Sequence, residues 1–120
     1  MSVILVTGAS TGIGHTTALH LAEKGHQVFA GLRNPEGVPD LRAKIAGGKL
    51  PIEVIQLDVS DTASVKAAVD GVMNSAGRID ALVNNAGIGG GRAVEETPLE
   101  EVRTIFETNY FGCVQMLLAV

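Results

Sequence analysis

Aromatic residues are scarce in this chain of 120 residues, which has three phenylalanines, one tyrosine and no tryptophan. A single cysteine, Cys113, excludes an internal disulfide and favours a reducing compartment. No apolar run approaches the length of about 18 residues that a membrane helix needs. The N-terminal run MSVILV is short and lacks the basic region of a signal peptide. We therefore expect a cytoplasmic protein that does not bind a membrane.

Positive charge is scarce as well, with nine Lys and Arg against thirteen Asp and Glu, for a net charge of −4. The cations form no run, so we expect no nucleic-acid partner. His15, His20 and His26 have no carboxylate or cysteine at metal-ligand spacing, so we predict no metal site. With 46% apolar and 18% charged residues, the chain can bury a core. Its length fits one domain, residues 1–120.

Four short apolar runs alternate along the chain with four helical patterns. The first run, SVILVT, does not alternate apolar with polar residues, which is typical of a strand covered on both faces. Predicted strands are residues 2–7, 27–32, 52–57 and 79–84, and predicted helices are 12–24, 41–47, 62–76 and a last helix that continues to the end. This alternation predicts an α/β fold, a Rossmann-like doubly wound parallel sheet with helices on both faces and strand order 3-2-1-4.

The helix starts carry capping signals. Asp40 is the predicted cap of the second helix, and Ser60 or Asp61 is the predicted cap of the third. In TPLE, Thr97 takes the cap position and Glu100 the third helical position, which predicts a capping box for the last helix.

The chain ends on the apolar residues MLLAV, inside the predicted last helix. The fourth strand is apolar and would form an exposed sheet edge, which favours aggregation. We expect the natural domain to continue beyond Val120, so that the fold in this chain is truncated after the fourth strand and its following helix.

The segment TGASTGIG, residues 7–14, places Gly8, Gly12 and Gly14 between the first strand and its helix. Free N–H groups at a helix start attract phosphate, and glycines let a ligand approach the backbone. The spacing G-x-x-x-G-x-G differs from the commoner dinucleotide fingerprint and from a P-loop, because no Gly-Lys-Ser/Thr follows. A tight turn with close helix packing remains the alternative interpretation.

Four motifs follow one another in order: TGASTGIG, LDVSD at 57–61, NNAG at 84–87 and Asn109 within ETNYFG. Together they resemble the short-chain dehydrogenases/reductases, and the resemblance covers essentially the whole chain. It implies an NAD(P)-dependent oxidoreductase that transfers a hydride between a nicotinamide cofactor and an alcohol or carbonyl substrate.

The resemblance also implies a set of cofactor-binding residues: Gly8, Ser10, Thr11, Gly12, Ile13, Gly14, Asp58, Val59, Asn85, Ala86 and Gly87. Asp58 would accept a hydrogen bond from the adenine amino group, with Val59 beside the ring. Asn109 would be catalytic and hold a water in a proton relay. From the residues alone, Asn109 shares a helical stripe with Phe106 and Cys113 and faces an apolar core. A structural asparagine bonded to neighbouring backbone is therefore the alternative.

The residues at the end of the second strand indicate which of the two nicotinamide dinucleotides, NAD or NADP, would bind. NAD-binding folds place an acid there for the ribose 2′-hydroxyl, but this chain has Leu32 followed by Arg33. A cation without a carboxylate favours the 2′-phosphate of NADP, although Arg33 could also be a solvated loop residue. Many NADP-dependent relatives carry a basic residue in the glycine loop, where this chain has Thr11.

The catalytic serine and the Tyr-x-x-x-Lys of the family have no match in this chain. Its one tyrosine, Tyr110, is followed by Val114 at the lysine position, and no lysine occurs after Lys66. We expect a cofactor-binding portion without turnover of its own. A non-catalytic dinucleotide-binding or regulatory module is the alternative, and a purely structural α/β domain is a third. The apolar last helix predicts a homo-oligomer in the full-length form, unless the rest of the chain covers it.

Overall fold

The computed structural model describes all 120 residues and contains one four-stranded sheet. Its strands are β1 (Val3–Thr7), β2 (Gln27–Leu32), β3 (Ile52–Gln56) and β4 (Ala81–Val83). Every pairing is parallel, and the order is β3-β2-β1-β4. The crossover helices are α1 (Gly12–Glu23), α2 (Pro39–Gly48) and α3 (Thr62–Ala76). The predicted fold class and strand order are confirmed.

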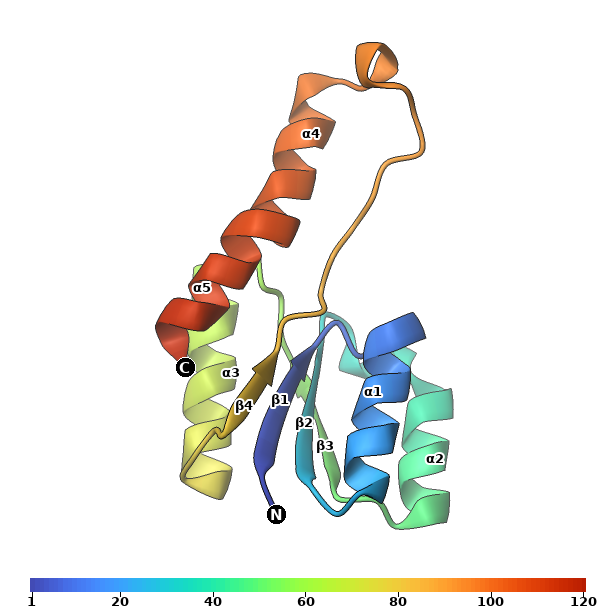
Figure 1. Cartoon of the computed structure of the whole chain (residues 1–120), viewed down its shortest axis with the longest axis vertical. Coiled ribbons are helices and arrows are strands. Elements are labelled where there is room, and N and C mark those ends of the chain that lie inside the picture. Colours follow the sequence, from blue (N-terminus) through green and yellow to red (C-terminus); the bar gives the residue numbers. More distant parts are fainter.

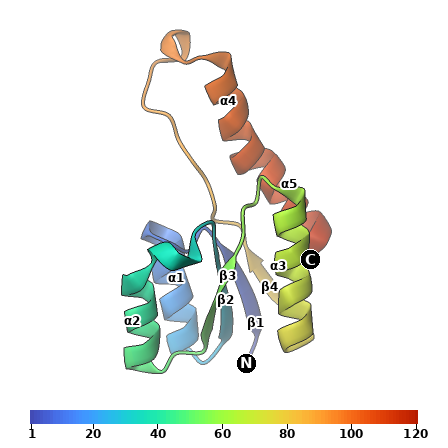
Figure 2. The same cartoon turned by 180° about the vertical axis from the view of Figure 1, so that it is seen from behind.

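Two separate cores lie on the two faces of the sheet, and β1 contributes to both. Val3 and Leu5 point into a core closed by α3, whereas Ile4 and Val6 point into a core closed by α1 and α2. The helices accordingly stand on opposite sides of the sheet in both views (Figures 1 and 2). Because both faces are covered, all five residues of β1 are buried, which explains the unbroken apolar run.

The chain after β4, residues 84–120, forms an arm. It begins with a loop and a short 3₁₀ turn (Val94–Glu96), followed by α4 (Leu99–Phe106), a π-helical turn (Glu107–Phe111) and α5 (Gly112–Ala119). The loop rises beyond the carboxyl edge of the sheet, and the chain then descends through α4 and α5, with α5 beside α3 (Figure 1). No helix, here or elsewhere, combines the length and the apolar character needed to cross a membrane.

Two predicted helix caps are wrong. α2 begins at Pro39 after Val38, so Asp40 lies in the first turn, because proline at the first position already has the helical φ. α4 begins at Leu99, and the Thr97 hydroxyl donates to the carbonyl of Ala93 (2.8 Å) instead of capping the helix. The predicted capping box is therefore absent.

Asp61 caps α3 and resolves the choice that the sequence left open. Its Oδ1 accepts from the N–H groups of Ala63 (3.0 Å) and Ser64 (3.3 Å). β4 is shorter than the predicted 79–84. Just before it, the Asp80 side chain accepts the Val3 N–H (2.7 Å), and the Asp80 N–H donates to the Val3 carbonyl (2.9 Å).

Candidate functional site

A cavity of about 350 Å³ opens at the carboxyl edge of the sheet. It is lined by residues at the ends of the strands and in the segments that directly follow them. Its lining residues are Gly8, Ser10, Thr11, Ile13, Leu32, Arg33, Leu57, Asp58, Val59, Asn85, Ala86, Gly87, Ile88 and Thr108. The structure thus brings together every predicted cofactor-binding residue except Gly12 and Gly14. Ligands of open parallel sheets bind at this edge.

Gly14 and Gly8 serve close packing around the cavity. A Cβ atom on Gly14 would overlap the Gly8 carbonyl oxygen and the Asn85 side chain, and Gly14 is buried. Gly8 has φ +67°, and a Cβ there would lie 2.7 Å from the Ala86 Cα atom. Both glycines therefore fit the packing interpretation of the loop, because they let β1, α1 and the segment after β4 touch.

Gly12 faces open space and lines a smaller neighbouring cavity with Ser10 and Thr11. It has φ +61°, and no atom lies within 4 Å of where its Cβ would be. Thr11 is the N-cap of α1 but its side chain accepts no hydrogen bond from the first turn. The N–H groups of this turn therefore lack a side-chain acceptor and remain available to an anion.

Thr7, the last residue of β1, locks the segment after β4 in place. Its buried hydroxyl accepts from the N–H groups of Asn85 (3.0 Å) and Ala86 (2.9 Å). The Asn85 amide in turn donates to the carbonyls of Thr7 (3.1 Å) and Gly8 (3.0 Å). Sequence reasoning missed Thr7, although a hydroxyl residue at the end of a buried apolar run was a visible signal.

Asp58 lines the cavity two residues after the end of β3. Ser60 donates to its Oδ1 twice, from the backbone N–H (3.0 Å) and from the hydroxyl (2.7 Å). The Asp58 N–H donates to the Ser64 hydroxyl oxygen (2.9 Å). Val59, which follows, is buried against Gly112 of α5.

Asn109 lies on the π-helical turn and is exposed, so the expectation that it faces an apolar core is wrong. Phe106 of the same predicted stripe is 57% exposed, and Cys113 is half-buried. A π turn changes the spacing of side chains along a helix, so a stripe of period 3.6 does not continue through it. The Asn109 amide exchanges two hydrogen bonds with the backbone of Ile88, at 2.8 Å and 2.7 Å.

Arg33 and Asp58 are the charged residues of the cavity lining. Arg33 is exposed and makes no ion pair or hydrogen bond with the protein. His15 contacts the Lys44 ammonium (3.5 Å), and no group of histidines, cysteines and carboxylates in the structure is placed to hold a metal ion. The cavity therefore combines a glycine loop, an uncapped helix start and a free guanidinium, which suits a phosphate-bearing ligand.

Comparison with known proteins identifies the family. A family model described as short chain dehydrogenase matches residues 2–120. The chain belongs to the short-chain dehydrogenase family. Among curated relatives, a 3-ketodihydrosphingosine reductase of Bacteroides thetaiotaomicron is 40% identical over 119 residues, which is 98% of this chain and 40% of the relative.

Solved structures of short-chain dehydrogenases superpose closely on this chain. An actinorhodin polyketide ketoreductase with NADPH gives a TM-score of 0.91 at 33% identity, over 98% of this chain and 45% of the other. An alcohol dehydrogenase of the archaeon Thermococcus sibiricus, complexed with 5-hydroxy-NADP, gives 0.90 at 32% identity, over 99% and 51%. The chain spans about half or less of the length of these relatives.

Proposed function

We propose that this chain is the cofactor-binding portion of an NAD(P)-dependent oxidoreductase that acts on an alcohol or carbonyl compound. The observation that carries the proposal is the cavity itself. It draws residues from five segments far apart in the sequence. Four of them carry the motifs that resemble the short-chain dehydrogenases, and the fifth is Leu32 and Arg33 at the end of β2. Solved relatives hold NADPH or 5-hydroxy-NADP, which supports a nicotinamide dinucleotide as the ligand.

The residues present suit a dinucleotide that crosses the carboxyl edge of the sheet. The uncapped first turn of α1 offers N–H donors to the pyrophosphate, with Ser10, Thr11 and Ile13 along the loop. Asp58 accepts from the adenine amino group, and Val59 lies beside the ring. Asn85, Ala86 and Gly87 follow the ribose on the nicotinamide side. When bound, the nicotinamide supplies the hydride chemistry.

NADP is the proposed dinucleotide, in preference to NAD. Leu32 ends β2 where an acid would bind a 2′-hydroxyl, and Arg33 follows it at the cavity. The guanidinium has no partner in the protein, so it is free to form a charge-assisted bond with a 2′-phosphate.

Asn109 is proposed as the residue that holds a water for proton transfer. An amide side chain can make about four hydrogen bonds, and Asn109 makes two of them with the backbone of Ile88. The exposed amide keeps its second N–H and a second lone pair for water. Its bonds to Ile88, a cavity residue, fix where that water would lie.

Turnover is proposed to need residues beyond this portion, because Tyr110 lacks the lysine four positions later. The same observation favours a second candidate, a non-catalytic module that senses the dinucleotide. Substrate-dependent oxidation of NADPH by the 120-residue chain would contradict the proposed inactivity. A sequence beyond Val120 without a serine and a Tyr-x-x-x-Lys would favour the sensor.

We also propose that the full-length form assembles with copies of itself. Phe106, Tyr110 and Leu117 of the arm are between 57% and 64% exposed. Such an apolar surface is typical of a protein interface. The single cysteine supports the proposed cytoplasmic location.

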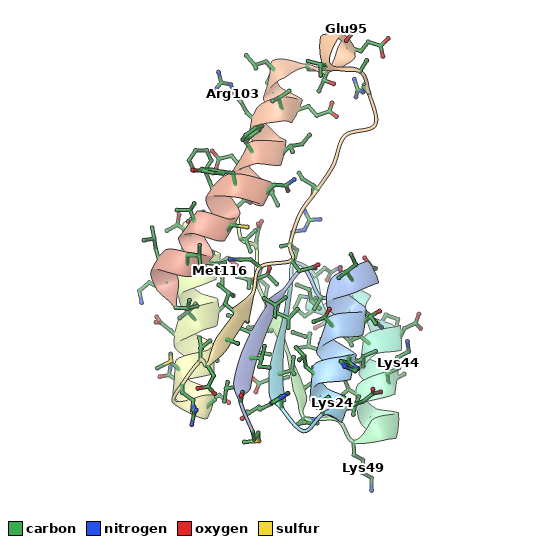
Figure 3. The ribbon with its side chains drawn as sticks, in the orientation of Figure 1. Lys24, Lys44, Lys49, Glu95, Arg103 and Met116 are labelled. Carbon is green, nitrogen blue, oxygen red and sulfur yellow. The ribbon has the colours of Figure 1, made fainter.

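Titration calorimetry with NADPH and NADH tests the cofactor proposal. We expect NADPH to bind about tenfold or more tightly than NADH, from a charge-assisted contact of roughly 1.5 to 3 kcal/mol. Arg33→Asp should reverse the preference. Arg103→Asp is the matched control, because Arg103 is exposed on α4 far from the sheet edge (Figure 3). Binding of neither dinucleotide to the wild type would overturn the proposal.

A further inference from the structure

We infer that Ser60 is a positioning residue for base selection, which orients the Asp58 carboxylate toward the 6-amino group of adenine. The inference rests on the proposed function and assigns a residue outside the cavity lining to one part of the dinucleotide. It requires that Ser60 act on the side chain of Asp58 and not on the fold of the turn.

The two carboxylate oxygens of Asp58 differ in their surroundings. Oδ1 accepts the N–H and the hydroxyl of Ser60, at 3.0 Å and 2.7 Å. Oδ2 has no hydrogen-bond partner in the protein, and Asp58 lines the cavity. Two donors on one oxygen fix the rotation of the carboxylate, because each bond constrains the same torsion. The second oxygen is thereby left for a ligand.

The backbone around Asp58 is held by other groups. The Asp58 N–H donates to Ser64 Oγ (2.9 Å), whose hydroxyl donates to Gln56 Oε1 (2.9 Å). The Asp61 N–H donates to the Asp58 carbonyl (3.1 Å) and closes the turn. Loss of the Ser60 hydroxyl therefore leaves the turn closed and removes the shorter of the two bonds to Oδ1, so that only the Ser60 N–H still restrains the carboxylate.

An oriented carboxylate distinguishes purine bases by their 6-substituent. An ionised carboxylate only accepts hydrogen bonds, so it pairs with the amino group of adenine. Hypoxanthine carries a carbonyl at the same position, which would place two acceptors against each other. The cost of such an unpaired contact gives selectivity, provided that the carboxylate cannot rotate away.

The test compares NADPH with its reduced hypoxanthine analogue, by titration of the wild-type chain and of Ser60→Ala. We expect the wild type to prefer the adenine form by about tenfold, and Ser60→Ala to reduce this preference to about threefold or less. Ser60→Thr, which keeps the hydroxyl, should restore it. Ser75→Ala is the matched control, since Ser75 lies at the opposite end of α3.

The outcomes separate this inference from the proposed function. An unchanged preference in Ser60→Ala, with NADPH still bound, overturns the role of Ser60 and leaves the cofactor proposal standing. Reduced nicotinamide mononucleotide lacks the adenine. If Ser60→Ala weakens the binding of this mononucleotide and of both dinucleotides equally, the role of Ser60 is also overturned, because that pattern indicates a structural role. A wild type that binds no dinucleotide overturns both.

Discussion

The sheet unit, residues 3–83, buries its two central strands, β1 and β2, between two layers of helices, whereas the arm, residues 84–120, lies largely on the surface. All buried residues of the chain precede Met73 except Gly112 and Met116. The sheet unit is thus stabilised by packing spread over two cores. The arm depends on a few separate contacts, so a change at one of them can release it while the sheet stays folded.

The contacts of the arm converge on the rim of the cavity. Gly112 packs on Val59, and the Gln115 amide donates to the Val59 carbonyl (3.1 Å) and accepts from the Thr62 hydroxyl (2.6 Å). Met116 reaches from α5 toward the core beside α3 (Figure 3). The segment that carries Asp58 therefore positions α5, whereas Thr7 holds the start of the arm at Asn85 and Ala86.

The largest expected effect is in the sheet unit, at Gly14. Gly14→Ala places a Cβ against the Gly8 carbonyl oxygen, a backbone atom that cannot move without shifting the loop. We expect a loss of about 3 kcal/mol in the free energy of unfolding and a melting temperature lower by roughly 10 °C, followed by circular dichroism.

The control is Gly71→Ala in α3, where no atom lies within 4 Å of the added Cβ. Alanine is the better helix former, so this variant should gain roughly 0.5 to 1 kcal/mol. Equal melting temperatures for the two variants would show that the packing around Gly14 is looser than the structure indicates.

A smaller effect, confined to the arm, is expected at Gly112. A Cβ on Gly112 would lie 2.6 Å from Cγ2 of Val59, a side chain that can yield in part. Gly112→Ala should cost about 1 to 2 kcal/mol. Hydrogen exchange should show faster exchange in α4 and α5 and unchanged protection in β1 and β2.

Adding Val59→Ala should restore part of that protection, because it removes the methyl group that the Cβ added at position 112 would meet. A double-mutant cycle measures this coupling. Faster exchange throughout the sheet would contradict the independence of the arm, and additive effects would contradict direct contact between the two positions.

The sheet unit could be predicted from the sequence because its signals are local and repeated. The unbroken apolar run of β1 indicated burial on both faces, and the alternation of strands with helices left few topologies. The grouping of cavity residues followed, since the carboxyl ends of parallel strands share one edge. The Asp40 cap failed because Pro39 and Val38 also fit the start of a helix.

The arm was harder to predict because its geometry depends on contacts between distant residues. Asn109 and Ile88 are 21 positions apart, and their paired hydrogen bonds coincide with the π turn that moves Asn109 out of the apolar stripe. Thr97 begins a sequence that fits a capping box, yet its hydroxyl donates to the carbonyl of Ala93. The periodic pattern of apolar residues indicates neither of these partners, Ile88 and Ala93.

The smallest expected effect is a pH dependence at Asp80, the polar anchor of β4 on β1. Hydrogen bonds from the Arg78 guanidinium and from the Val3 N–H hold the pKa of the Asp80 carboxyl below its ordinary value of 3.8. A carboxyl with a lower pKa in the folded state stabilises it above the unfolded value and loses that contribution as the pH falls through the folded value.

Urea unfolding of Asp80→Asn and wild type between pH 7 and pH 3 measures this contribution. The variant should be less stable by a constant amount at pH 6 to 7, and the difference should shrink below about pH 4 as Asp80 in the wild type becomes protonated. Asp40→Asn is the control, because Asp40 is exposed and makes no ion pair. A difference that stays constant down to pH 3 would show that the charge of Asp80 does not stabilise the fold, and no difference at any pH would show that β4 is held by its backbone pairing alone. In that case the sheet unit depends on polar anchors less than the arm does, and the contrast between the two regions becomes sharper.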